Sequence, residues 1–206
     1  MEVAIIDYGA GNVGSLVNML NRKCDCSCRV ESAANGLQLN ATHCILPGVG
    51  HFGFAAGQLR IQGIDVRLRS FVEEGGHLLG ICLGAQLLLD SSEEGDADGL
   101  GFIPGQVRKF QNEQLRSGER IPHMGWSDVE PKGLKLGMGG DESKRFYFVH
   151  SYHMVPRNQD DIYMTADFAG GFTAAVKRGN ITGVQFHPEK SHAFGIAFLK
   201  SWLSES

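Results

Sequence analysis

The segment Gly80-Ile81-Cys82-Leu83-Gly84 sets a cysteine between small residues, after the apolar run His77 to Ile81 and before the helix-like run Leu83 to Asp90. This layout is typical of a nucleophile on a strained strand-to-helix turn, because larger side chains beside it would clash with neighbouring backbone. Such a turn holds the thiol at the carboxyl edge of a sheet, where backbone N–H groups at the helix start favour its ionised form. We therefore predict that Cys82 is a nucleophile.

A second segment, Val184-Gln185-Phe186-His187-Pro188-Glu189, contains an imidazole and a carboxylate at the end of an apolar run. In an extended chain, positions i and i+2 face the same way, so Glu189 is expected to reach the ring of His187. A base that is oriented by a third group is the general arrangement for activating a thiol. Cys82, His187 and Glu189 are therefore the candidate catalytic residues.

Short apolar runs alternate with segments of helical periodicity in the first half of the chain. Strands are predicted over Val3–Ile6, Arg29–Ser32 and Cys44–Leu46, and helices after Asn12 and from Ile64 to Val72. Strands that alternate with helices are typical of a doubly wound parallel sheet. The sequence therefore predicts an α/β fold whose largely parallel sheet is flanked by helices.

The second half contains mostly strand-like segments and one final helix, predicted from Ala193 to Leu203. The turn Arg178-Gly179-Asn180 joins the last two strands into a hairpin, so we expect an antiparallel extension of the sheet in this half. The predicted strands cover Gln106–Phe110, Phe146–Val149, Ile162–Ala166, Thr173–Lys177 and Ile181–Phe186, and a loop is predicted over Gly137–Ser143.

Length, composition and charge favour an enzyme of one domain over residues 1–206, since 206 residues with 42% hydrophobic content can bury one substantial core. A net charge of −4 without a dense basic cluster argues against nucleic acid as a partner. No apolar run approaches the roughly 18 residues that span a bilayer, and the first residues lack the basic start of a secretion signal. We therefore expect a cytoplasmic protein without membrane partners.

Five cysteines cannot all pair, and a cysteine nucleophile must be free, which favours a reducing compartment. Three of them form a C-x-C-x-C run, Cys24, Cys26 and Cys28. This spacing is not the usual zinc spacing, and no nearby histidine completes a site, so we expect reduced thiols rather than a bound metal.

The segment Gly9-Ala10-Gly11-Asn12-Val13-Gly14 permits a competing hypothesis, because it is a literal G-x-G-x-x-G between a strand and a helix. Glu31 lies about where a ribose-binding acid would fall in a dinucleotide-binding protein. This motif accounts for neither the Cys82 turn nor the His187-Pro188-Glu189 segment. We therefore expect no cofactor, and dinucleotide binding remains the remote alternative.

Six segments together resemble the class I glutamine amidotransferase family over nearly the whole chain, and within it the branch of glutaminase subunits that serve imidazole glycerol phosphate synthesis. The Cys82 turn and the His-Pro-Glu segment are shared by the wider family, whereas several of the others are similar to that branch. The segments are Asp7–Asn12, Leu46–Gly53, Gly80–Leu88, Pro122–Trp126, Phe148–Tyr152 and Gln185–Ser191.

The resemblance implies a glutaminase: Cys82 attacks the carboxamide of L-glutamine, ammonia leaves, and water hydrolyses the glutamyl thioester. His187 transfers the protons and Glu189 orients it. The backbone N–H of Leu83 and one from Val49 or Gly50 would stabilise the oxyanion. By the same resemblance, the residues that hold glutamine are Gly50, Gln86, Ser151 and Tyr152.

The resemblance also implies a partner, because the family passes ammonia to a separate (β/α)₈ barrel cyclase of histidine biosynthesis. This chain is too short to contain such a barrel as well, since a barrel needs about 250 residues. The expected assembly is a heterodimer that is weakly active without the liganded cyclase. The residues implied for the docking face are Asn12, Met124, Trp126, Tyr147 and Lys190.

Two departures from the family pattern leave alternatives open, namely Ser127 where asparagine is usual and Ala85 where methionine is common. One alternative is a paralogue that feeds ammonia to a different barrel synthase, for example one that aminates a sugar nucleotide. Another is an idle regulatory subunit, against which the intact Cys82, His187 and Glu189 argue. Four of the remaining histidines lie in family-like motifs and are expected to be structural or near the subunit interface: His51, His123, His150 and His153. The other three are expected to be satisfied by local hydrogen bonds: His43, His77 and His192.

Overall fold

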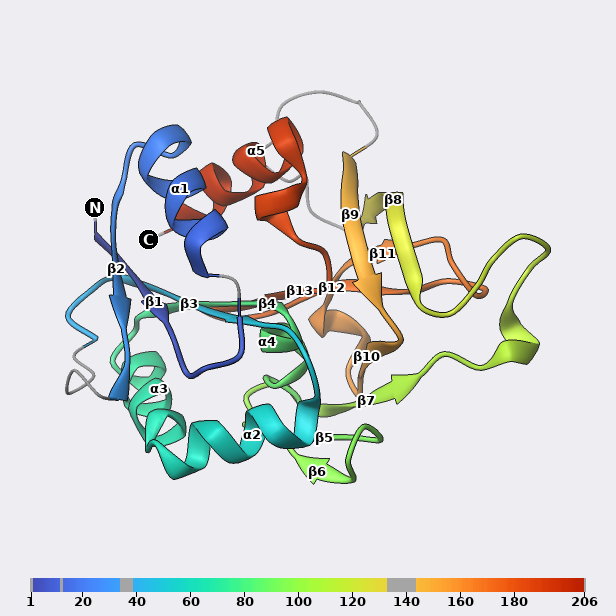
Figure 1. Cartoon of the computed structure of the whole chain (residues 1–206), viewed down its shortest axis with the longest axis horizontal. Helices are drawn as coiled ribbons and strands as arrows, with labels where there is room; N and C mark the ends of the chain where they lie inside the picture. The colour runs from blue at the N-terminus through green and yellow to red at the C-terminus, as the bar shows by residue number, and fades with distance from the viewer. Residues whose placement is uncertain (1, 12, 34–38, 133–143, 206) are drawn as a thin grey trace.

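The computed structural model describes residues 2–11, 13–33, 39–132 and 144–205. Helices lie on both faces of a sheet that is parallel in its first part and mostly antiparallel in the rest (Figure 1). The parallel strands lie side by side in the order β2-β1-β3-β4-β13. Their bounds are Glu2–Ile6 (β1), Ser27–Glu31 (β2), His43–Gly48 (β3), His77–Cys82 (β4) and Ile181–Val184 (β13).

Alternate residues of β1 serve opposite faces of the sheet, as the period of a strand requires. Val3 and Ile5 belong to a buried cluster that includes residues of α1 (Val13–Lys23) and α5 (His192–Leu203). Ala4 and Ile6 belong to a second cluster with α2 (Phe52–Ile61) and α3 (Ile64–Glu73). Figure 1 shows α1 and α5 on one side of the sheet and α2 and α3 on the other. This is the doubly wound arrangement that the sequence predicts.

The sheet continues from β13 through antiparallel strands in the order β12-β10-β7, followed by the short β5 and β6. A branch of β11, β8 and β9 pairs with β12 through β11. These strands are Ser91–Ser92 (β5), Ala97–Asp98 (β6), Gly105–Lys109 (β7), His123–Pro131 (β8), Lys144–His150 (β9), Tyr152–Pro156 (β10), Ile162–Ala166 (β11) and Phe172–Arg178 (β12). The antiparallel extension is therefore confirmed.

Several element boundaries and one strand pairing differ from the sequence prediction. The helix after Cys82, α4, covers only Leu83–Gln86. Strand β3 continues through Pro47 and Gly48, and β13 pairs parallel with β4 although it forms an antiparallel hairpin with β12. The predicted loop over Gly137–Ser143 lies outside the described residues. Across the described ranges, no helix has the length and apolar character needed to cross a membrane.

Candidate active site

Cys82 is the last residue of β4, and it lies opposite Gly48 of β3 in the parallel register. Its backbone has φ 54° and ψ −110°, a conformation that residues with a side chain rarely adopt. The two flanking glycines allow the turn, because a Cβ on Gly80 would lie 2.6 Å from the Gly84 carbonyl oxygen, and one on Gly84 would overlap Leu46 O. The strained strand-to-helix turn predicted from the sequence is confirmed.

His187 and Glu189 are in contact, but not for the reason that an extended chain gives. His187 precedes a short 3₁₀ helix, η4 (Pro188–Lys190), which turns Glu189 back so that its Oε1 lies 2.8 Å from His187 Nδ1. The His187 side chain is buried, and the Glu189 side chain is 9% exposed. The backbone of His187 is held as well, since its N–H donates to Tyr147 O at 2.9 Å and Ser191 Oγ donates to its carbonyl oxygen at 2.6 Å.

The surroundings of His187 favour its charged form. Burial by itself would lower the pKa of His187, but the neighbouring Cys82 sulfur and Glu189 carboxylate outweigh burial and raise this pKa to about 10. The second ring nitrogen, Nε2, is buried and makes no hydrogen bond within the described part of the chain. This nitrogen can therefore hold or accept a proton beside the Cys82 thiol.

A cavity of about 360 Å³ opens at the carboxyl edge of β3 and β4. Cys82 and His187 both line it, so the fold brings together two groups that are far apart in the sequence. All six residues predicted to bind substrate or stabilise an oxyanion line the same cavity: Val49, Gly50, Leu83, Gln86, Ser151 and Tyr152. The residues predicted to bind substrate therefore all lie at the cavity that contains Cys82 and His187.

In the loop predicted to supply an oxyanion donor, one N–H already has a hydrogen-bond acceptor. The Val49 N–H donates to Ala10 O at 3.4 Å, which is a long hydrogen bond. Gly50 has a φ of +106°, which favours glycine, and the Val49 side chain is 45% exposed. The N–H of Val49 is thus directed at the loop after β1 and must turn to serve the cavity.

Two glutamines form a buried hydrogen-bond network behind Cys82. Gln86 Nε2 donates to Tyr152 O at 2.9 Å and to Gln185 Oε1 at 3.1 Å. Gln185 Nε2 donates a hydrogen bond to Cys82 Sγ at 3.8 Å. Sequence reasoning assigned no role to Gln185, although its place two residues before His187 could have drawn attention to it.

Glu94 lines the cavity, and no role for it was predicted from the sequence. Its Oε2 accepts from the Phe52 N–H at 2.8 Å, so the carboxylate is held by the first turn of α2. Glu94 lies in a polar stretch without a recognisable motif, so nothing in the sequence distinguishes it from surface acids. Only the fold brings it to the cavity.

Four of the five residues predicted for docking lie on one surface next to the cavity. Trp126 on β8 stacks on the ring of His192 at 5.5 Å and lies edge-on to Tyr147, and Lys190 Nζ lies 5.7 Å from the centre of the Tyr147 ring. Met124 and Trp126 are 63% and 38% exposed. The fifth, Asn12, lies outside the described residues.

The glycine-rich segment after β1 supports a neighbouring loop. A Cβ on Gly11 would lie 3.6 Å from Pro47, and Ala10 O holds the Val49 N–H. Glu31, the candidate ribose-binding acid, is buried and forms an ion pair with Arg29. This geometry favours a structural role for the segment over dinucleotide binding.

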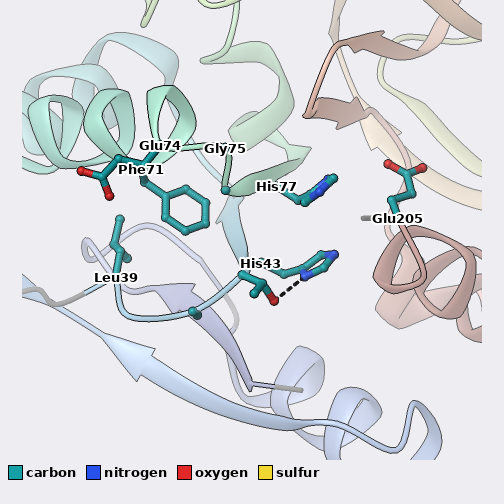
Figure 2. Close-up of a pocket in the computed structure, with 10 residues that line it drawn as sticks. Leu39, His43, Phe71, Glu74, Gly75, His77 and Glu205 are labelled. Atoms are coloured by element: carbon teal, nitrogen blue, oxygen red, sulfur yellow. Dashed lines mark hydrogen bonds between the residues drawn. The ribbon is translucent and has the colours of Figure 1, made fainter.

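Another cavity, of about 450 Å³, lies at the amino edge of the sheet, at the opposite end of β4 from Cys82 (Figure 2). The rings of His43 and His77 stack there at 4.8 Å, and Thr42 Oγ1 bonds His43 Nδ1 at 2.9 Å (Figure 2). His43 Nε2 and His77 Nδ1 are buried without a hydrogen-bond partner among the described residues. The local hydrogen bond predicted for His43 is present at Nδ1, whereas the described residues supply none to His77 Nδ1.

The fold and the cavity agree with the comparisons to known proteins. The model of the glutamine amidotransferase class-I family matches residues 4–203. The chain therefore belongs to the class-I glutamine amidotransferase family. Solved structures agree at the level of the fold, including one of PurLQS from Thermotoga maritima with a TM-score of 0.75, 18% identity, and coverage of 98% of this chain and 97% of that chain.

Full-length relatives narrow the family to one branch. The imidazole glycerol phosphate synthase subunit HisH 2 of Methanococcus maripaludis is 44% identical over 206 residues, which cover 99% of this chain and 100% of the relative. HisH 2 of Pseudomonas aeruginosa is 40% identical, with 98% of both chains covered, and HisH of Leptospira interrogans is 40% identical, with 98% and 99% covered. Within the family, this chain groups with the HisH subunits.

Proposed function

We propose that this chain is the glutaminase subunit of an imidazole glycerol phosphate synthase, a cytoplasmic heterodimer that makes the imidazole intermediate of histidine biosynthesis. The single observation that carries the proposal is the shared cavity of Cys82 and His187, with Glu189 bonded to the histidine ring. The names of the relatives support the choice of branch.

The reaction proceeds in two steps on Cys82. The thiolate attacks the side-chain carbonyl of L-glutamine, and the protonated His187 gives its proton to the departing ammonia, which leaves a glutamyl thioester. His187 then takes a proton from water, the resulting hydroxide adds to the thioester, and glutamate leaves as the thiolate re-forms. The raised pKa of His187 keeps the proton available for the first step.

Substrate binding follows from the charges and donors that line the cavity. The N–H of Leu83, next to the nucleophile, and an N–H of Val49 or Gly50 would hold the oxyanion. Gln86, Ser151 and Tyr152 would hold the amino-acid end of glutamine. The Glu94 carboxylate complements the α-ammonium group, since it is the one carboxylate among the residues that line this cavity.

We propose that the partner activates the enzyme through the Val49 loop. The Val49 N–H is held by Ala10 O across a long bond of 3.4 Å, so little free energy opposes its turning toward the cavity. A cyclase barrel that docks over Met124, Trp126, Tyr147 and Lys190 would lie beside this loop and receive ammonia directly. Low activity alone and strong activation by the liganded cyclase are the expected result.

Glutamate release with and without the candidate cyclase, for the wild type and Cys82→Ala, tests the proposal. We expect weak release alone, strong release in the complex, and none from Cys82→Ala. Full activity of the isolated chain would contradict the activation mechanism. Activation only by a sugar-nucleotide synthase would support the paralogue instead, and the absence of activity in every wild-type sample would support an idle subunit.

A further inference from the structure

Three hydrogen-bonded side chains link β8 to β9 beside the glutamine cavity. His123 and His150 lie directly opposite each other in the antiparallel register of these strands. His123 Nε2 lies 2.9 Å from Ser127 Oγ, and His123 Nδ1 lies 3.1 Å from His150 Nε2. His150 Nδ1 lies 2.8 Å from Tyr152 O. Both imidazoles are buried, so these bonds have little competition from water.

The Tyr152 carbonyl, at one end of this series of hydrogen bonds, fixes which atom donates and which accepts in each of them. A carbonyl oxygen can only accept, so His150 must carry its proton on Nδ1 and present a bare Nε2. His123 must then donate from Nδ1, and its bare Nε2 must accept the hydroxyl proton of Ser127. Burial lowers the pKa of His123 to about 4 and that of His150 to about 3, so both rings are neutral near pH 7.

The Tyr152 carbonyl also connects this series of hydrogen bonds to the cavity. Tyr152 O also accepts from Gln86 Nε2, whose other N–H goes to Gln185 Oε1. Gln185 in turn donates toward Cys82 Sγ. The orientation of the Gln86 carboxamide, which lines the cavity, therefore depends on a carbonyl whose other partner is His150.

We propose that Ser127, His123 and His150 are positioning residues for glutamine: the Tyr152 carbonyl fixes the two imidazole tautomers, and the Ser127 hydroxyl, bonded to the far imidazole, holds both rings against that carbonyl and, through it, orients Gln86. None of the three reacts with substrate. This inference rests on the proposed glutaminase function and adds Ser127, on the strand that carries Met124 and Trp126, to the residues that determine affinity for glutamine.

Steady-state kinetics of the complex with the cyclase test the effect on substrate. Ser127→Ala removes the donor, and we expect KM for glutamine to rise about five- to tenfold while kcat changes less than twofold, as for a lost hydrogen bond that acts on binding. Ser127→Thr keeps the hydroxyl and should restore the wild-type KM. Asp128→Ala, at an exposed site on the same strand, is the matched control. An unchanged KM in Ser127→Ala, or an equal rise in Asp128→Ala, overturns the proposal.

Nuclear magnetic resonance of ¹⁵N-histidine-labelled protein tests the chain independently of catalysis. In the wild type, His123 and His150 should both appear as neutral Nδ1–H tautomers at pH 7, and Ser127→Ala should shift the His123 Nε2 resonance, because this nitrogen loses its hydrogen bond, while Ser127→Thr leaves it at the wild-type position. An Nε2–H tautomer for either residue in the wild type overturns the proposal even if the protein hydrolyses glutamine. Correct tautomers in a protein without glutaminase activity would instead contradict the proposed function.

Discussion

Position 82 combines a reactive side chain with a backbone conformation that suits glycine. The φ of 54° and ψ of −110° at Cys82 cost a residue with a Cβ on the order of 1–3 kcal/mol. We therefore expect Cys82→Gly to be at least as stable as Cys82→Ala, although glycine usually costs about 0.5–1 kcal/mol more than alanine within a strand or helix. Urea unfolding of the two variants measures the difference. A clearly more stable Cys82→Ala would show that the backbone at this position is unstrained.

The glycine two residues later is required by its surroundings. A Cβ on Gly84 would overlap Leu46 O, a backbone atom that cannot move without shifting β3. We expect Gly84→Ala to lose roughly 2 kcal/mol or more of unfolding free energy, or to fail to fold.

Gly57, in the middle of α2, provides the control for this variant. A Cβ there would have no heavy atom within 4 Å, so Gly57→Ala should be neutral or stabilising by about 0.5–1 kcal/mol. Equal losses in the two variants, measured by thermal or urea unfolding, would contradict the role given to the Leu46 contact.

At the scale of elements, the strand pair β8 and β9 is expected to be sensitive to acid. The folded-state pKa values of His123 and His150, about 4 and about 3, lie below the unfolded value of about 6.5. The unfolded chain therefore binds more protons below about pH 6.5, and each histidine lowers the stability by about 1.4 kcal/mol per pH unit down to its folded pKa. Above pH 6.5 neither histidine contributes to the change of unfolding free energy with pH.

His123→Asn isolates this effect, because the amide can still donate to His150 but does not titrate. Between pH 6.5 and 4.5, the wild type should lose roughly 2 kcal/mol more unfolding free energy than this variant. Urea titrations at a series of pH values measure both slopes. Parallel curves for the wild type and His123→Asn across this window would mean that His123 is protonated in the folded protein.

The sequence predicted those elements whose hydrophobic pattern has one dominant period. Strand β1 is a continuous apolar run, and α1 buries Leu16 and Leu20 at helical spacing. Helix α2 was missed because two of its four buried residues are alanines and glycines lie among them, which gives a weak periodic signal; the four are Phe52, Ala55, Ala56 and Leu59. Strand β8 was missed because two of its largest apolar side chains, Met124 and Trp126, are exposed, so burial does not follow hydrophobicity there.

The predicted site residues came from short motifs, whereas Glu94 lies outside any motif and Gln185 lies inside one in which it had no assigned role. The Cys82 turn and the His187-Pro188-Glu189 segment each carry a local geometry, so their meeting at one cavity could be anticipated from the topology. Glu94 reaches the cavity through its bond to the Phe52 N–H on α2. Such long-range contacts have no local sequence pattern, and only the folded chain shows them.

At the scale of the whole molecule, the exposed aromatic surface beside the cavity predicts how the complex responds to mutation. Trp126 is supported by the His192 and Tyr147 rings, and large supported aromatics commonly contribute most to binding energy. We expect Trp126→Ala to weaken the complex with the cyclase by about 2 kcal/mol, roughly thirtyfold in Kd.

Ile61 on α2 is the matched control, because its side chain is 80% exposed on a helix that is remote from the predicted docking residues. Ile61→Ala should leave the Kd of the complex at the wild-type value. Calorimetric titration of the cyclase with each variant gives the comparison. A similar loss of affinity in both variants, or none in Trp126→Ala, would place the docking surface elsewhere.

The parallel pairing of β13 with β4 has a consequence for the folding of the protein while it is being synthesised. Gln185 and Cys82 are 103 positions apart, and the strand that leads to Gln185 closes the centre of the sheet only after the intervening antiparallel part has been made. Pairing over such a separation is slow, because the chain entropy lost in closing the loop precedes the contacts that compensate it. A nascent chain therefore carries its Cys82 thiol without the His187 imidazole until β13 and the segment after it have been translated, and glutamine hydrolysis can begin only then.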